Sequence, residues 1–534
     1  MMIIHTRYII LTYFVLIKKQ YVRSCYHSCT DYCKKLLSFM YRLYLQAALK
    51  ALCNLQSNAH YLKSAVKNNP NDFNKLSEIK KYLLRCDITS EKLDTLSVIH
   101  VTGTKGKGST CAYTEAILRE QGFSTGFFSS PHLITVRERI RINGQPISQT
   151  HFSQQFWKVY KKLEDMKEHE FDMPMYFKFL TVLMFNIFLD ANVDVAIIEV
   201  GIGGEQDCTN IVRNPVCVGI TSLGLEHTSL LGNTIEEIAY QKSGIFKPKT
   251  SAFTVPQLPR AMRVLEKRAV EKNCTLHLVP PFEEYRWENL SPILKITSNI
   301  QQQNASLAIQ MATTWMTKTD KYSDILYNAE NGNKFYNKYK ENTQLSTVIK
   351  PNITFMDKIA VGISSCKWPG RMQILESSIA NFFLDGAHTI ESIECCISWF
   401  NDITSKSRGK RFLIFNTSGT RDSEKLLTPL KSLRFSKAYF VPNFAGIQSI
   451  DDETNCSSMD EQRHKCEINA NIWGTDSLVK NSVKEVLQDI KKNFEKEVNR
   501  DNDEKYQILI TGSLHLVGAA LTILDRNLTM SSQF

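Results

Sequence analysis

Short apolar runs alternate with longer amphipathic stretches through most of the chain from about residue 45 onward. The runs are rich in Val, Ile and Phe, and many end at Gly, Asp or Asn, which is typical of buried β-strands. We expect strands at 97–101, 194–200, 216–221, 381–384, 411–415, 438–441 and 507–511. Helical patterns lie between many of these runs, as at 109–122, and strands that alternate with helices predict parallel α/β sheets.

Two polar stretches interrupt this alternation, and we expect both to be surface loops or insertions rather than core. Residues 317–352 are rich in Asn, Lys, Tyr and Asp, and residues 448–472 are polar and charged. The first ends shortly before Trp368-Pro369-Gly370-Arg371, which favours a hinge at this point. We therefore expect a larger α/β domain over 45–367 and a smaller one over 370–528.

The positive charge of the 534-residue chain is concentrated near its N-terminus. Eight Lys or Arg residues against a single acid, Asp31, give residues 1–50 a charge of +7, which leaves +4 of the total of +11 for the rest. A basic surface for nucleic acid would have raised the charge of the folded body. We therefore expect no nucleic-acid partner.

The N-terminal segment also contains an apolar run of ten residues, 8–17, that ends at Lys18-Lys19. A membrane-spanning helix needs about 20 apolar residues, so we expect no stable membrane span. The basic character and the lack of acids before Asp31 favour a mitochondrial presequence over 1–44, for a location in the mitochondrial matrix, the cytoplasm or both. A secretory signal and a misassigned start, with Met40 opening a cytosolic form, are the alternatives.

A Gly-rich loop, Gly103–Ser109, lies between an expected strand and an expected helix. In that setting glycines let backbone N–H groups face phosphate oxygens, and the helix N-terminus and lysines add positive charge. Gly108 stands where the common Walker pattern has Ser or Thr after Gly-Lys. The loop therefore favours a nucleotide phosphate site over a simple turn, without indicating what the nucleotide does.

Several long motifs carry a more specific resemblance. They are VTGTKGKGSTCAYTEAILREQGFSTGFFSSPHLITVRERIRINGQPIS, IIEVGIGGEQDCTNIV, LGLEHTSLLGNTIEEIAYQKSGIFK, WPGRMQ, FFLDGAHT and ITGSLHLVGAAL. In this order they resemble the folylpolyglutamate synthase family of the Mur ligase superfamily, over most of residues 45–525. The resemblance implies an α/β protein with a P-loop-type N-terminal domain and a smaller Rossmann-like C-terminal domain.

The resemblance also implies an ATP-dependent amide ligase that extends a γ-linked glutamate tail on tetrahydrofolate. The folate carboxylate would attack ATP to form an acyl phosphate, which the amino group of L-glutamate would then displace. The implied partners are ATP, reduced folate, L-glutamate and Mg²⁺, with a monovalent cation such as K⁺ as a further candidate, and we expect a monomer. A dihydrofolate synthase, a bifunctional enzyme and a non-catalytic nucleotide-binding module are the alternatives.

The same resemblance assigns roles to individual residues. The family's ATP-binding positions match Lys105, Gly106, Lys107, Gly108, Asn304, Arg371 and Asp385. Its metal-binding positions match Ser129, Glu199 and His227. Its catalytic positions match Lys107, His388 and Lys242, and the last of these is a lysine that is carbamylated in relatives. Taken alone, Asn304 could cap a helix, Glu199 could form a salt bridge, and His227 could be a structural histidine. Ser130–Leu133 and Arg137–Arg139 resemble a loop that frames folate, with a surface ion-pair network as the alternative. Glu226 stands where the family usually has Asp.

Overall fold

The computed structural model describes residues 31–55, 76–319, 353–532 and 534, apart from 171, 288, 295–298, 418–420, 448–457 and 498–503. The apolar run at 8–17 and most of the polar stretch at 317–352 lie outside these residues. None of the helices in the described part of the chain combines the length and apolarity needed to cross a membrane.

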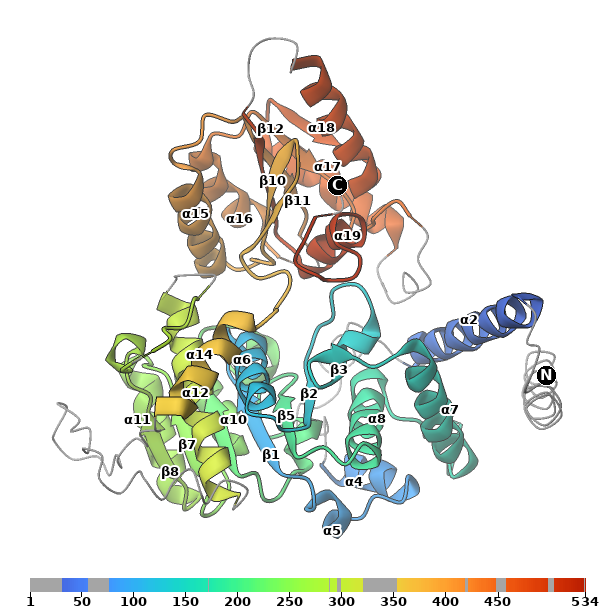
Figure 1. The fold of residues 1–534 in the computed structure, drawn as a ribbon, viewed down its shortest axis with the longest axis vertical. Coiled ribbons are helices and arrows are strands. Elements are labelled where there is room, and N and C mark those ends of the chain that lie inside the picture. Colours follow the sequence, from blue (N-terminus) through green and yellow to red (C-terminus); the bar gives the residue numbers. More distant parts are fainter. Residues whose placement is uncertain are drawn as a thin grey trace.

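The N-terminal half is built on an eight-stranded sheet (Figure 1). Its strands are β1 (Val98–Thr102), β2 (Thr125–Phe128), β3 (Ile140–Ile142), β4 (Gln145–Pro146), β5 (Val195–Glu199), β6 (Cys217–Ile220), β7 (Ser251–Thr254) and β8 (Thr275–Leu278). They are arranged in the order β4-β3-β2-β5-β1-β6-β7-β8, and only the β2–β3 and β3–β4 pairs are antiparallel. The carboxyl ends of the other strands therefore meet at one edge, where ligands bind in open α/β sheets.

Helices cover both faces of this sheet because alternate side chains of its central strands point to opposite sides. Val98 and Ile198 belong to a core with α2, α4, α7 and α8, whereas Ile99 and Ile197 belong to a second core with α6, α12 and α14. The helices of this half are α2 (Asp31–Asn54), α4 (Leu76–Arg85), α5 (Ser90–Leu93), α6 (Lys107–Glu120), α7 (Gln149–Asp165), α8 (Tyr176–Asp190), α9 (Thr228–Leu231), α10 (Ile235–Lys242), α11 (Pro259–Glu271), α12 (Asn299–Lys318) and α14 (Ile353–Ser365). Short 3₁₀ turns complete it at Val136–Arg139, Cys208–Ile211, Ser243–Ile245 and Phe282–Glu284.

The C-terminal half forms a second, six-stranded sheet that lies above the first in Figure 1. Its strands are β9 (Gln373–Glu376), β10 (Ala380–Leu384), β11 (Arg411–Phe415), β12 (Lys437–Phe440), β13 (Ser477–Val479) and β14 (Tyr506–Thr511). The order is β13-β12-β11-β14-β10-β9, and only β9 runs antiparallel to its neighbour. The helices are α15 (Ile390–Thr404), α16 (Ser423–Leu430), α17 (Met459–Trp473), α18 (Val483–Glu497) and α19 (Leu514–Leu524), with a 3₁₀ turn at Lys431–Leu433.

The composition of the polar stretch at 448–472 predicted a surface loop or insertion, but part of the stretch is helical in the structure. Residues 459–473 form α17, which packs on α16 and β12 and buries Cys466 and Asn469. The stretch looks like a loop because most of the helix faces solvent and few of its residues are apolar. Residues 448–457 lie outside the described part of the chain.

The helix α2 crosses the expected boundary between leader and body at residue 44. Leu45, Leu49 and Leu52 are buried in the N-terminal core, and the Tyr44 carbonyl accepts a hydrogen bond from Trp157 Nε1 at 3.4 Å. The apolar side of α2 from Leu45 onward is therefore part of the folded body, whereas residues 1–30 lie outside the described structure.

Candidate active site

The Gly-rich loop connects β1 to α6 at the carboxyl edge of the first sheet. The N–H groups of Thr104 and Lys105 both donate to the Ser222 carbonyl, at 2.9 and 3.1 Å, which fixes the loop against the chain that follows β6. Gly106 caps α6 with a φ of 89°, and a Cβ there would lie 2.3 Å from Asn304 Oδ1. Only glycine fits this left-handed position, so the sequence pattern follows from the close approach of α12.

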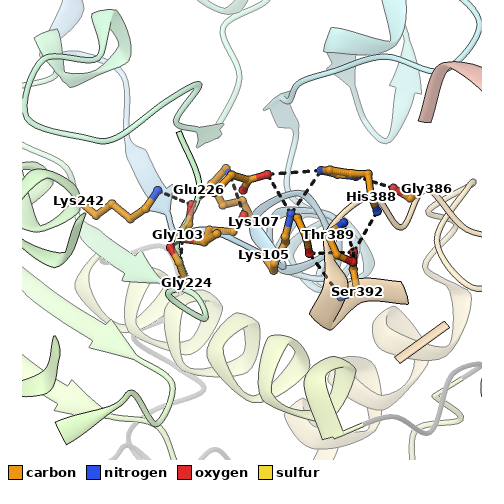
Figure 2. A network of polar contacts seen from close by, with 11 residues as sticks. Gly103, Lys105, Lys107, Gly224, Glu226, Lys242, Gly386, His388, Thr389 and Ser392 are labelled. Atoms are coloured by element: carbon orange, nitrogen blue, oxygen red, sulfur yellow. Dashed lines mark hydrogen bonds and ion pairs between the residues drawn. The ribbon is translucent and has the colours of Figure 1, made fainter. Parts of the chain in front are cut away.

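Two lysines surround the first glycine of the loop (Figure 2). Lys107 Nζ donates to the carbonyls of Gly103 and Thr104, at 3.1 and 3.3 Å, and Lys242 Nζ donates to the Gly103 carbonyl at 2.7 Å. Burial lowers the pKa of Lys242 well below its ordinary value, and the nearby charge of Lys107 adds to the effect. Lys242 is therefore held towards its neutral amine form, next to the phosphate loop.

The two domains meet at a polar contact centred on Glu226, as Figure 2 shows. Glu226 Oε1 accepts from Lys105 Nζ at 2.9 Å and lies 3.4 Å from His388 Nε2, which in turn is 3.3 Å from Lys105 Nζ. Burial alone would raise the pKa of Glu226, but the positive charge and hydrogen bond of Lys105 outweigh it and hold that pKa well below its usual range. The carboxylate therefore remains charged between the phosphate loop and the C-terminal domain.

The contact of His388 Nδ1 shows which ring nitrogen carries the hydrogen. Nδ1 lies 2.6 Å from the Gly386 carbonyl, which can only accept, so Nδ1 carries the hydrogen. Burial lowers the pKa of His388, so the ring is held towards its neutral form. The neutral ring then presents the lone pair of Nε2 towards Lys105 and the phosphate loop.

The three residues expected to bind a metal differ in their surroundings. Glu199 ends β5 and is buried, and its Oε2 accepts from the Ser130 N–H at 2.9 Å. A Cβ on Gly108 would lie 3.5 Å from Glu199 Oε2, so the carboxylate faces the phosphate loop. Ser129 follows the neighbouring strand β2 at the same edge, whereas His227 is exposed and caps α9 with a φ of 53°.

The side chains of Glu199, Ser129 and His227 fit a Mg²⁺ site that takes only part of its ligands from the protein. Within the described residues, no group of three or more His, Cys, Asp or Glu side chains could hold a metal ion. Mg²⁺ typically takes one or two carboxylates and completes its shell with phosphate oxygens and water. Burial raises the pKa of Glu199, and the positive charges of Lys107 and Arg371 oppose this, so a further cation beside the carboxylate would favour its charged form.

In the C-terminal domain, Arg371 and Asp385 lie together beside the hinge. Asp385 is buried and accepts from the Met372 N–H at 2.8 Å, and burial raises the pKa of its carboxyl while the charge of Arg371 opposes the rise. Arg371 lines a pocket between the domains with Ser129, Pro131, Leu133, Glu138, Arg141, Trp368, Pro369 and Leu514. The pocket therefore joins the expected ATP-binding arginine to the strand end that carries Ser129.

Asn304 lies inside α12 and does not cap a helix. Its Oδ1 accepts from Thr110 Oγ1 and its Nδ2 donates to Gln301 Oε1, both at 3.3 Å. Together with its close approach to Gly106, these contacts place Asn304 directly beside the phosphate loop.

Comparison with known proteins identifies the family. Residues 101–312 match the family model described as Mur ligase middle domain, and residues 371–523 match the model described as Dihydrofolate synthetase, C-terminal domain. The mitochondrial folylpolyglutamate synthase of Cricetulus griseus is 36% identical over 550 residues, which cover 91% of this chain and 92% of the relative. The chain belongs to the folylpolyglutamate synthase family.

Other members of the folylpolyglutamate synthase family and solved structures agree with this assignment. The mitochondrial folylpolyglutamate synthase of Homo sapiens is 41% identical over 438 residues, covering 80% of this chain and 73% of the relative. The Mycobacterium tuberculosis folylpolyglutamate synthase complexed with ADP has a TM-score of 0.65 at 21% identity, covering 90% of this chain and 99% of that one. E. coli FolC in complex with DHPP and ADP has a TM-score of 0.63 at 23% identity, covering 90% of this chain and 98% of that one. These two structures support the fold expected for a folylpolyglutamate synthase.

The structure also shows how the loop expected to frame folate is held, a role that the resemblance did not assign to Glu138. The buried Glu138 accepts from the N–H groups of Leu133, Ile134 and Thr135, at 3.1, 2.8 and 2.7 Å, and so holds the loop after β2. Thr135 and Glu138 form a capping box, and the Thr-x-x-Glu spacing is a sequence signal for it. The tie from Thr104 and Lys105 to Ser222 has no comparable signal, since it depends on the pairing of β1 with β6.

Proposed function

We propose that the chain adds L-glutamate to the γ-carboxylate of tetrahydrofolate and its polyglutamates, by way of an acyl phosphate, and so retains folates in the cell. Membership in the folylpolyglutamate synthase family supports an ATP-dependent folate–glutamate ligase, as the sequence motifs predicted. One observation carries the mechanism: Glu226 and Lys105 of the first domain meet His388 of the second beside the phosphate loop. A ligase needs this arrangement, because ATP bound by one domain must meet groups of the other.

The nucleotide site combines residues from both domains. Lys105, Gly106, Lys107 and Gly108 would cradle the phosphates at the start of α6, with Asn304 beside them. Arg371 would bind phosphate oxygens through its planar guanidinium, and Asp385 would accept from ribose hydroxyls. These contacts would hold the γ-phosphate in line for attack by the folate carboxylate, whose oxygen bonds to phosphorus as ADP leaves.

Glu199, with Ser129 and His227 as further ligands, would hold Mg²⁺, which supplies positive charge to the phosphate oxygens. Lys242 is held towards a neutral amine, the form that reacts with carbon dioxide. Its carbamate would place a negative charge beside Gly103. That charge would stabilise a cation at the carboxyl edge of the sheet.

His388 would take part in the second half-reaction. The amino group of L-glutamate must lose a proton before its nitrogen attacks the acyl carbon and phosphate leaves. The neutral His388 ring, with hydrogen on Nδ1, would accept that proton at Nε2 once Lys105, which lies 3.3 Å from Nε2, binds phosphate instead. The Gly386 carbonyl would stabilise the protonated ring through the same Nδ1–H.

The decisive experiment supplies the full chain with ATP, Mg²⁺, labelled L-glutamate and either tetrahydrofolate or dihydropteroate. Lengthened tetrahydrofolate supports the proposal. Label incorporated only into dihydropteroate would favour a dihydrofolate synthase, and label incorporated into both would indicate a bifunctional enzyme. Hydrolysis of ATP without ligation would refute the ligase mechanism.

We also propose that the protein acts as a monomer in mitochondria and the cytoplasm. The relatives from Cricetulus griseus, Bos taurus and Homo sapiens are named mitochondrial, and residues 1–44 are basic. Translation from Met40 would keep the buried side chains of α2, which begin at Leu45, and would give the cytoplasmic form. A reporter fused to residues 1–45 should enter mitochondria, and light scattering should give the mass of one chain.

A further inference from the structure

The loop between β2 and the 3₁₀ turn at Val136–Arg139 belongs to the first domain but packs on the second. Leu133 and Ile134 lie against the hydrophobic core of the C-terminal sheet, together with residues of α19. Figure 1 shows the segment between β2 and β3 rising from the first domain to α19. The loop therefore forms an apolar contact between the domains, in addition to the polar contact at Glu226.

Two glycines of the second domain leave room for Leu133. A Cβ on Gly370 would lie 3.0 Å from Leu133 Cδ2, and a Cβ on Gly518 would lie 2.0 Å from the Leu133 carbonyl oxygen. Gly518 is inside α19, where glycine costs about 1 kcal/mol relative to alanine. The close approach of the Leu133 backbone accounts for this unfavourable residue, because any side chain at 518 would displace the loop.

The same loop is tied to the expected metal site. Glu138 accepts from three successive N–H groups, beginning with Leu133, and so ties residues 133–135 to one carboxylate. Three residues before Leu133, the Ser130 N–H donates to Glu199 Oε2 at 2.9 Å. Only Pro131 and His132 separate Leu133 from Ser130, so a shift of Leu133 would be passed along a short stretch of backbone to the carboxylate that faces the phosphate loop.

We propose that Leu133 is a positioning residue for the ligation: its docking between Gly370 and Gly518 fixes the Ser130 N–H against Glu199, and so aligns the Glu199 carboxylate only when the second domain is in place. This inference rests on the proposed function. Nucleotide binding by the phosphate loop does not depend on Leu133, since Lys105 and Lys107 are held by contacts elsewhere. The residue should therefore affect turnover much more than nucleotide affinity.

The test compares Leu133→Ala, Leu133→Met and Gly518→Ala with Ile523→Ala in the full-length protein. Ile523 is a partly buried aliphatic residue of the same core, but it comes from α19 rather than from the loop. We expect kcat to fall about tenfold in Leu133→Ala and Gly518→Ala, with the Kd of ADP within about twofold of wild type. Leu133→Met should restore most of the turnover, and Ile523→Ala should leave kcat within about twofold of wild type.

A second measurement does not depend on turnover. Hydrogen exchange should speed up at the amides of residues 130–135 in Leu133→Ala and Gly518→Ala, and not in Ile523→Ala, because the loop loses its anchor. If Gly518→Ala does not fold, as judged by thermal unfolding, the two Leu133 variants decide. Wild-type kcat with unchanged exchange in Leu133→Ala would overturn the inference, and so would an equal loss of turnover in Ile523→Ala. A wild-type protein that does not ligate would count against the proposed function, while the exchange comparison would still test the anchoring.

Discussion

Replacing Glu226 by glutamine should tighten nucleotide binding while slowing turnover. Glu226 Oε1 is 2.9 Å from Lys105 Nζ, so the positive charge of a phosphate-loop lysine has a carboxylate partner. A nucleotide phosphate must compete with this carboxylate for Lys105. The Glu226→Gln variant would keep the length of the side chain without its charge, which leaves Lys105 available to the phosphate.

The expected size of the effect follows from the geometry. Two unit charges 4 Å apart interact by about 1 kcal/mol in water and by about 4 kcal/mol at an effective dielectric constant of 20. The Glu226 and Lys105 side chains are 21% and 33% exposed, so solvent screens the pair and the lower figure applies, about 1 kcal/mol. That energy corresponds to a roughly fivefold decrease in the Kd of ADP.

The assay is calorimetric titration of ADP in the presence of a chelator, so that metal binding does not contribute. Glu226→Asp is the matched control, because it keeps the charge and shortens the arm by one methylene. We expect about fivefold tighter binding for the glutamine variant and little change for the aspartate variant, which should also retain substantial ligase activity. Unchanged or weaker ADP binding by Glu226→Gln would refute the competition argument, and a loss of ~100-fold in kcat for Glu226→Asp, about 2.7 kcal/mol, would show that the site requires the longer arm.

Three further predictions concern the phosphate-loop residue Lys107, the buried Lys242 and the core histidine His100. Lys107→Ala should reduce ATP turnover at least about 100-fold with little change in the melting temperature, as measured by ADP release and thermal unfolding. Lys242→Arg should abolish a carbamate signal in carbon NMR with labelled bicarbonate and lower kcat, since burial holds Lys242 towards the neutral amine and arginine cannot form the carbamate. Burial lowers the pKa of His100 to about 3, from the ordinary 6.5. Between these values the unfolded chain binds a proton that the folded chain does not, so stability falls as pH falls, and His100→Leu should reduce that slope by roughly 1 kcal/mol per pH unit near pH 5–6 in denaturant unfolding.

The apolar runs predicted the central strands because those strands are covered on both faces. The expected strand at 194–200 is β5, Val195–Glu199, and all five of its residues are buried. Two of the strands that were not predicted, β8 (Thr275–Leu278) and β13 (Ser477–Val479), lie at the sheet edges and are partly exposed, whereas β2 (Thr125–Phe128) was missed although it is fully buried. Their short, mixed sequences carry no clear periodicity, so only the neighbouring strand defines them.

The phosphate loop could be predicted from local spacing, whereas the contacts between the domains could not. Glu226 and His388 are 162 residues apart in the sequence. Glu226 follows strand β6 of the first sheet, and His388 follows strand β10 of the second. The contact of Leu133 with Gly518 involves a carbonyl oxygen, which leaves no trace in the residue type of the loop itself. The family resemblance could point to His388 and Glu226 individually. It could not show that both side chains contact the same ammonium group, Lys105 Nζ.

The two links between the domains differ in kind, and this difference assigns them different roles. The link at Glu226 is polar and uses Lys105, which the nucleotide also needs, so ATP binding must weaken it. The link at Leu133 is apolar and uses no group that binds nucleotide, so it persists when ATP enters. Trp368 of the hinge packs on the same side, since a Cβ on Gly108 would lie 2.8 Å from its ring. The polar link therefore responds to the nucleotide, whereas the contacts of Leu133 and Trp368 hold the domains together without any group that the nucleotide needs.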